Sequence, residues 1–300
     1  MGARILDGRA ISDEIFDDVA GQVAELTAGG WPPKLISIRI GENPAVDLYI
    51  RNQKRKAERV GIAFEERQIP AEVSLEEMRA LLYTLNVDPG VTGIILQRPV
   101  PPGLSIRALQ GAIHPLKDVE GMHPASIGNI VYNELDLGPC TAMASIEMLR
   151  RTGLGLKGLE VTVIGHSEIV GKPIAFLLMA EGATVTVCHH MTRDVALHSK
   201  ESDVVFIAVG RPSLLKAEMV KPGAVVVDIG INQIEGADGQ PKVVGDCDYE
   251  ACKEVAGWIT PVPGGVGPVT VAMLMRNTVR AVRRLKQHYD AQFGEVSVVA

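Results

Sequence analysis

The stretch that decides the fold is Val161-Thr162-Val163-Ile164-Gly165-His166-Ser167-Glu168-Ile169-Val170-Gly171-Lys172-Pro173. Its β-branched start predicts a buried strand over 161–164, which runs directly into Gly165, a residue that can turn where a side chain would clash. The helix predicted over 170–180 would present free N–H groups and a positive dipole end, both suited to phosphate. Because the pattern is not G-x-G-x-x-G, a purely structural strand-to-helix turn is the alternative interpretation.

Further strands are predicted on the C-terminal side of this stretch. Short β-branched runs separated by helical or turn segments occupy 183–187, 204–209 and 224–229. This alternation is typical of a Rossmann-like, doubly wound parallel sheet that binds a nucleotide, and we place such a domain at 139–268.

A second α/β series is predicted on the N-terminal side. Its strands are expected over 35–40 and 92–97, with helices over about 11–26 and 45–60 and a further helix that begins at a capping box of Ser74 and Glu77. The last helix, from about 269 to 288, is expected to return to this series. We therefore predict an α/β chain of two domains, the first comprising 1–138 and the C-terminal segment 269–300.

Composition excludes several classes of function. The 300 residues are enough for about two domains, and the formal net charge of −6 argues against nucleic acid or a membrane surface as partner. No run reaches the roughly 20 apolar residues of a membrane span, and the N-terminus lacks the pattern of a signal peptide. The four cysteines lack metal-like spacing and are expected to be reduced thiols of a cytoplasmic protein, and no metal site is expected.

A second glycine cluster, Thr260-Pro261-Val262-Pro263-Gly264-Gly265-Val266-Gly267-Pro268, precedes the last helix. Proline stiffens such a loop, while glycine lets a ligand approach the backbone closely. A merely structural turn rarely needs so many residues of both types, so we interpret the loop as part of a binding site.

Taken in order along the chain, these motifs resemble those of the bifunctional methylenetetrahydrofolate dehydrogenase/cyclohydrolase (FolD) family. The resemblance covers almost the whole chain and rests on Gly41–Ala45 with Tyr49, Gly93–Gln97, Lys117–Gly121 with His123-Pro124, Pro139-Cys140-Thr141, Gly165–Pro173, Asp228–Asn232 and Thr260–Pro268.

The resemblance implies an enzyme that oxidises 5,10-methylenetetrahydrofolate with NAD(P) and hydrolyses the methenyl product to 10-formyltetrahydrofolate. It also implies a two-domain subunit, usually a homodimer, whose first domain is the folate-binding catalytic domain. Folate would lie near Tyr49, Gln97, Glu120, Pro263, Gly264 and Gly265. The cofactor would be held by Gly165, His166, Ser167, Ile169, Gly171, Pro173, His190, Gly210 and Ile231.

Hydride transfer from a carbon between two nitrogen atoms needs alignment more than a strong base. Tyr49 is suited to stack on the flat folate rings, and Glu120 to accept hydrogen bonds from the pterin. Read without the family, Tyr49 is a half-buried helix residue, Glu120 a solvated carboxylate and Gln97 a plain amide at a strand end.

The hydrolysis step is different, because protons must move as the ring opens. The family uses a lysine four residues after the tyrosine, and this chain has Gln53 there, whose amide cannot carry a proton in the needed range. Lys54 is turned by about 100° around the helix, whereas Lys56 shares the face of Tyr49 and Gln53. Lys56 lies about 4.5 Å further along the axis, however, and a solvated surface lysine is the preferred interpretation of it. We therefore predict that hydrolysis is weak or absent.

Other readings stay open. One is a fully bifunctional enzyme in which Gln53 and Lys56 together replace the lysine. Another is a folate- or nucleotide-binding protein without catalysis, and a third is a dehydrogenase for another substrate. The intact segments 228–230 and 264–268 argue against loss of the hydride site.

Other departures from the family pattern concern both ligands. Glu120 replaces the usual Asp, Arg98 the usual Leu and Ala142 the usual Pro, which reshapes the folate pocket. NADP-preferring relatives usually have Arg at His166 and Ser at His190. The histidines at these positions argue against NADP, because an imidazole suits phosphate less well than an Arg fork. The second strand nevertheless ends without the acid typical of NAD sites. We therefore expect NADP, with two imidazoles and Ser167 around the phosphate, and NAD stays the alternative.

Overall fold

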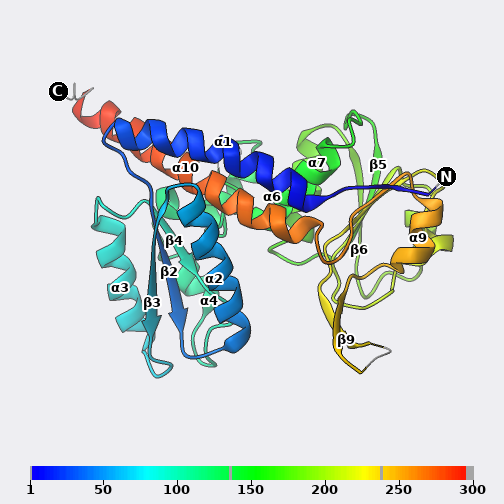
Figure 1. Cartoon of the computed structure of the whole chain (residues 1–300), viewed down its shortest axis with the longest axis horizontal. Helices are drawn as coiled ribbons and strands as arrows, with labels where there is room; N and C mark the ends of the chain where they lie inside the picture. The colour runs from blue at the N-terminus through cyan, green and yellow to red at the C-terminus, as the bar shows by residue number, and fades with distance from the viewer. Residues whose placement is uncertain (1, 135–136, 237–238, 295–300) are drawn as a thin grey trace. The chain divides into compact units, whose positions relative to one another are not determined.

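The computed structural model describes residues 2–134, 137–236 and 239–294 (Figure 1). They form two compact units. We call residues 2–12, 130–133 and 139–270 the six-strand unit, and residues 13–129, 134–138 and 271–294 the three-strand unit, within the described ranges. Three helices contribute residues to both units: α1 (Gly8–Ala28), α5 (Pro124–Val131) and α10 (Val266–Phe293).

The six-strand unit contains a fully parallel sheet, which confirms the predicted doubly wound fold. Its order is β6-β5-β7-β8-β11-β1, with Ile164 paired to Cys188 on one side and to Ile207 on the other. The two neighbours of β5 in the sheet, β6 and β7, both come after it in the sequence and lie on opposite sides of it. The end of β5 is therefore a topological switch point. The strands are β1 (Arg4–Ile5), β5 (Glu160–Ile164), β6 (Thr184–Cys188), β7 (Val204–Ile207), β8 (Val225–Asp228) and β11 (Trp258–Ile259).

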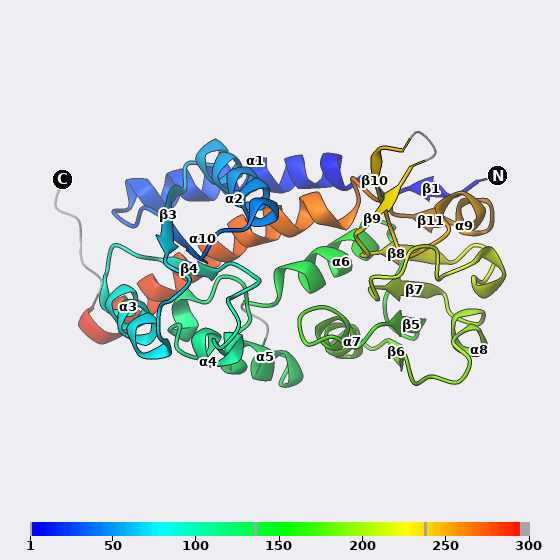
Figure 2. The same ribbon diagram turned by 90° about the horizontal axis from the view of Figure 1, so that it is seen from below.

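Helices cover both faces of this sheet, so its interior strands β7 and β8 are buried at every position. In Figure 2, α6 (Cys140–Arg150) and α7 (Gly171–Ala180) lie on one side of the sheet, and α8 (Ala196–Ser199) and α9 (Tyr249–Val255) lie on the other. The short turn η2 spans Ala217–Met219, and an antiparallel hairpin joins β9 (Asn232–Glu235) to β10 (Pro241–Val244).

The three-strand unit is built on β2 (Lys34–Ile40), which pairs in parallel with both β3 (Ala63–Ile69) and β4 (Gly93–Leu96). Its helices are α2 (Pro44–Arg59), α3 (Leu75–Val87), α4 (Ile106–Gln110) and α5 (Pro124–Val131), with the turn η1 at Pro115–Lys117. The predicted capping box is present, since Glu77 N donates to Ser74 Oγ and Ser74 N donates to the Glu77 carboxylate.

The C-terminal helix returns to the three-strand unit, as predicted. There α10 runs beside α1 (Figure 1), and Arg283 forms a 3.8 Å ion pair with Glu25. The rings of Trp31 and Tyr289 meet edge to face at 5.6 Å. Among the described residues, no helix has the length and apolarity needed to span a membrane.

Candidate active site

A buried chain of polar side chains joins three elements of the three-strand unit. Gln97, which directly follows β4, donates from Nε2 to Oε1 of Gln53 on α2 (2.7 Å) and to Oγ of Ser37 on β2 (3.0 Å). Gln53 is 1% exposed and Gln97 5% exposed. Tyr49, one helical turn before Gln53, is 42% exposed and so presents its ring at the surface of α2. The structure therefore brings Gln53 and Gln97 into direct contact, a contact that sequence spacing alone does not reveal.

Lys56, one turn further along α2, lies against α1. Its Nζ is 4.6 Å from the centre of the Phe16 ring, a cation–π arrangement. Partial burial lowers the pKa of Lys56, the Asp13 carboxylate acts in the opposite direction, and the Arg59 guanidinium adds to the lowering. The ammonium group is thus held by contacts of its own on α1.

Glu120 follows η1 and lies beside the end of β4. Its Oε2 accepts a 3.3 Å hydrogen bond from Leu96 N. Burial raises the pKa of Glu120 to about 7; the Asp118 carboxylate adds to the rise, and the Arg98 guanidinium opposes it. A carboxyl group with this pKa changes its charge near neutral pH.

The loop that carries Glu120 is firmly held on both sides. The Asp118 carboxylate accepts hydrogen bonds from His123 N and Ser126 Oγ, each at 2.7 Å. Asn277 on α10 donates from Nδ2 to Val119 O (2.9 Å) and Gly138 O (3.0 Å). The helix that returns from the C-terminus therefore positions this loop, and Asn277 was not among the predicted site residues because nothing local marks it.

In the six-strand unit, the loop after β5 is sterically restricted to glycine at two positions. Gly165 has φ +116°, and a Cβ atom there would lie 2.3 Å from Ala208 O. A Cβ atom on Gly171 would lie 1.9 Å from Gly165 O, so the first turn of α7 packs directly on the strand end. In the described ranges, the N-terminus of α7 has no side-chain cap hydrogen bond and lies at the switch point, so this cradle fits the phosphates of a dinucleotide.

The other predicted cofactor residues occupy the same unit. Ser167 Oγ accepts from Val170 N (3.2 Å), Pro173 is buried in α7, and Ile169 and Ile231 are exposed. Gly210 has φ +64° in the loop after β7. That loop is fixed by Asp246, whose carboxylate accepts hydrogen bonds from three consecutive backbone N–H groups, those of Val209 (2.6 Å), Gly210 (3.0 Å) and Arg211 (2.8 Å).

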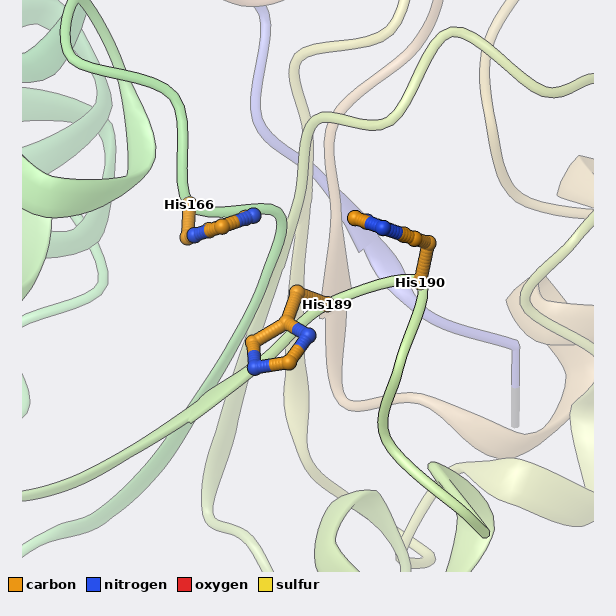
Figure 3. A group of neighbouring side chains, drawn as sticks. All are labelled: His166, His189 and His190. Atoms are coloured by element: carbon orange, nitrogen blue, oxygen red, sulfur yellow. The ribbon is translucent and has the colours of Figure 1, made fainter.

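Three histidines meet beyond the ends of β5 and β6 (Figure 3). His166 and His190 point toward each other, and the ring of His189 lies near both, with one nitrogen from each residue within 4.8 Å of the others. His166 and His190 were predicted site residues and His189 was not, and no metal site was expected. His166 precedes His189 by 23 positions in the sequence. The two meet here because neighbouring parallel strands end at the same edge of the sheet.

The proline–glycine loop before α10 contacts the N-terminus of α1. Gly264, with φ +109°, accepts a 2.9 Å hydrogen bond at its carbonyl from Gly8 N, and a Cβ atom on Gly265 would lie 2.5 Å from Pro261 O. The peptide bond before Pro263 is cis. The backbone conformation and close packing within the six-strand unit therefore favour glycine at positions 264 and 265, in addition to any contact with a ligand.

Two family models match the chain. The catalytic domain of tetrahydrofolate dehydrogenase/cyclohydrolase matches residues 6–120, and the NAD(P)-binding domain of the same family matches residues 139–286. The chain belongs to this family. Membership confirms the predicted resemblance and makes the protein an NAD(P)-dependent oxidoreductase of tetrahydrofolate-bound one-carbon units.

Relatives from several organisms match over nearly their full length. "Bifunctional protein FolD 2" of Mesorhizobium japonicum is 60% identical over 298 residues, which cover 99% of this chain and 97% of the relative. "Bifunctional protein FolD" of Rhodobacter capsulatus is 60% identical over 94% of each chain. The structure of the Trypanosoma brucei enzyme, complexed with NADP and an inhibitor, superposes with a TM-score of 0.90 at 35% identity, covering 96% of this chain and 99% of that one.

Proposed function

We propose that this protein oxidises 5,10-methylenetetrahydrofolate with NADP and hydrolyses the methenyl product only slowly. The observation that carries the second part is the contact between Gln53 and Gln97. At the position where the family has a proton-carrying lysine, this chain has a buried amide whose oxygen already accepts a hydrogen bond.

The oxidation step requires little acid–base chemistry from the protein. NADP supplies the hydride acceptor when bound. The exposed ring of Tyr49 offers a flat surface for stacking on the folate, and ionised Glu120 offers acceptors for the N–H groups of a pterin. Binding and orientation by these groups are sufficient, because alignment dominates the barrier to hydride transfer.

Hydrolysis needs a group that can release and take up a proton beside the reacting carbon. The amide of Gln53 has no proton to exchange near neutral pH. The ammonium of Lys56 lies over the Phe16 ring and so has its own place on α1. Both observations support slow hydrolysis.

A fully bifunctional enzyme is the second candidate, and two observations favour it. The relatives at 60% identity are named bifunctional proteins. In addition, burial lowers the pKa of Lys56 and raises that of Glu120 to about 7, so two titratable groups of the three-strand unit are shifted toward the range useful for proton transfer.

Two assays on one preparation separate these candidates. Cofactor reduction on addition of methylenetetrahydrofolate measures oxidation, and the loss of methenyltetrahydrofolate absorbance measures hydrolysis. We expect rapid oxidation with hydrolysis close to the buffer rate. Fast hydrolysis that Lys56→Ala abolishes would establish the bifunctional enzyme instead, and no turnover with either cofactor would favour a non-catalytic binding protein.

NADP is proposed over NAD because of the groups at the ends of β5 and β6. His166, His190 and Ser167 can donate to a phosphate, and β6 runs into Cys188-His189-His190 without an acid for ribose hydroxyls. Comparison of kcat/KM with both cofactors at pH 6 and pH 8 tests this. A strong NAD preference at both pH values would overturn it.

We also propose that residues 1–138 with 269–300 form the folate-binding domain and 139–268 the NAD(P)-binding domain of a cytoplasmic homodimer. The matched family ranges, 6–120 and 139–286, support a boundary near residue 139. The NAD(P)-binding model continues to residue 286, so the assignment of 269 onward to the first domain is supported by the contact of α10 with α1 instead. Residues 295–300 lie outside the described part of the chain, and β1 pairs with β11 in the six-strand sheet. Sedimentation equilibrium of the purified protein tests the dimer, and a monomer mass would contradict it.

A further inference from the structure

We propose that His166, His189 and His190 form a binding site for a divalent transition-metal ion, of which Zn²⁺ is the best match. Imidazole nitrogen is a preferred ligand of Zn²⁺, and sites with three protein ligands leave a fourth position open. His166 extends from the end of β5, and the other two extend from the end of β6, so the backbone that carries them is held by the parallel pairing of these strands.

Small side-chain rotations are sufficient to bring the three histidine nitrogen atoms to the spacing that a zinc ion requires. One nitrogen of each histidine lies within 4.8 Å of the other two. A tetrahedral ion with ligands at about 2.0–2.1 Å needs nitrogen atoms about 3.4 Å apart. His166 and His190 are exposed and already face each other (Figure 3), so their rings can close the difference without moving the backbone.

His189 has one competing contact. Its Nδ1 accepts a 3.1 Å hydrogen bond from Met191 N, so the neutral ring carries its proton on Nε2. A metal can be bound at Nδ1 in place of this hydrogen bond, or at Nε2 after the proton moves to Nδ1, which breaks the same bond. Within the described part of the chain, a side-chain hydrogen bond occupies the ring of His189 and none occupies the rings of His166 and His190, so His189 contributes less to affinity than the other two.

The ring contacts support a shared ligand. The centroids of His166 and His189 are 4.7 Å apart, and His190 lies 6.1 Å from His166 and 5.9 Å from His189. The three rings are grouped at the rim of the sheet, and the exposed side chains of His166 and His190 make the group accessible to an ion from solvent.

Direct titration of the untagged, full-length protein with ZnCl₂ by calorimetry, in phosphate-free and chelator-free buffer, tests the site. We expect one ion per chain. His166→Ala and His190→Ala should each weaken binding at least tenfold, and His189→Ala less. His198→Ala, which removes a histidine of α8 outside this cluster, is the matched control and should bind like the wild type. Circular dichroism verifies that each variant is folded.

X-ray absorption at the zinc edge gives an independent readout, in which we expect imidazole nitrogen ligands that decrease in number in the alanine variants. Less than about one ion in five chains, or unchanged affinity in both His166→Ala and His190→Ala, would overturn the proposal.

A functional consequence rests on the proposed NADP site. If these imidazoles also hold the cofactor phosphate, the open fourth position of bound Zn²⁺ should attract a phosphate oxygen, lower KM for NADP and leave KM for NAD nearly unchanged, and His198→Ala should behave like the wild type. Zinc binding that the variants abolish, without any effect on KM for NADP, would retain the metal site and contradict only the cofactor placement.

Discussion

Gln97 and Gln53 share a hydrogen bond of 2.7 Å, in which the amide N–H of Gln97 is the donor and the amide oxygen of Gln53 the acceptor. The pair is buried, and Ser37 is a second acceptor for Gln97. A lysine at position 53 can only donate, so the Gln97 amide would have to turn its oxygen toward the new ammonium group. The orientation of the Gln97 amide in this chain is therefore the opposite of the one that a lysine at position 53 would require.

Gln53→Lys should raise the rate of methenyltetrahydrofolate hydrolysis at least tenfold, because it introduces a group that can carry a proton beside Gln97. Burial of the new charge should reduce the free energy of unfolding by about 1–3 kcal/mol. Gln53→Leu is the control and should not gain hydrolysis. Stopped-flow absorbance measures the rate, and equal rates in the two variants would show that position 53 does not limit the reaction.

Glu120 should make substrate binding depend on pH. With a pKa of about 7, the carboxyl is mostly protonated at pH 6 and mostly ionised at pH 8, and the ionised form accepts stronger hydrogen bonds from the N–H groups of a pterin. KM for methylenetetrahydrofolate should therefore fall as pH rises from 6 to 8. Glu120→Gln should have a higher KM at pH 8 and a flat profile, and a wild-type slope in this variant would exclude Glu120 as the cause.

Ionisation of the Glu120 carboxyl as pH rises should lower the free energy of unfolding. In the unfolded chain Glu120 loses its proton near its ordinary pKa of 4.5, whereas in the folded chain it keeps it up to about pH 7. Its contribution to stability is therefore greatest below pH 4.5 and is lost as pH rises to 7. Thermal unfolding should show Glu120→Gln more stable than the wild type at pH 8, by at most about 3 kcal/mol, and similar at pH 4.5.

Asn277→Leu should weaken folate binding from a distance. Its amide supports Val119 O and Gly138 O, and Val119 directly precedes Glu120. Loss of both bonds should cost about 1–3 kcal/mol of unfolding free energy and raise KM for methylenetetrahydrofolate several-fold, with KM for NADP unchanged. Gln287→Ala, on the exposed part of α10, is the control. Equal rises in both KM values would indicate general loosening instead.

Asp246→Asn should disturb the loop after β7. An amide presents one acceptor and one donor where the carboxylate accepts from the N–H groups of three residues, 209–211, so we expect a loss of about 2–4 kcal/mol and a raised KM for the cofactor. Asp248→Asn removes only the half-exposed ion pair with Lys216 and should cost less than about 1 kcal/mol. Similar losses in both variants, measured by urea unfolding, would contradict the special role of Asp246.

Sequence patterns were sufficient where structure is determined locally. The β-branched run 161–164, the glycine turn and the helix after it were predicted because strand propensity and the positive φ of Gly165 are local properties. The clash of a Cβ atom on Gly165 with Ala208 O is a tertiary contact that the sequence does not reveal. The edge strand β3 was not predicted, since its centre, Glu65-Glu66-Arg67, is charged and only partly buried. The strands β1 and β11 have two residues each, too few to show any periodicity.

The amino-acid sequence by itself determined the fold class, the family and the replacement of the expected lysine by Gln53, because each depends on residue identity and spacing along the chain. Only the tertiary structure decided that Gln97 holds the Gln53 oxygen, that Lys56 lies over Phe16 and that His189 joins His166. These contacts join residues on different elements, so they exist only after strand pairing and helix packing have brought distant segments together.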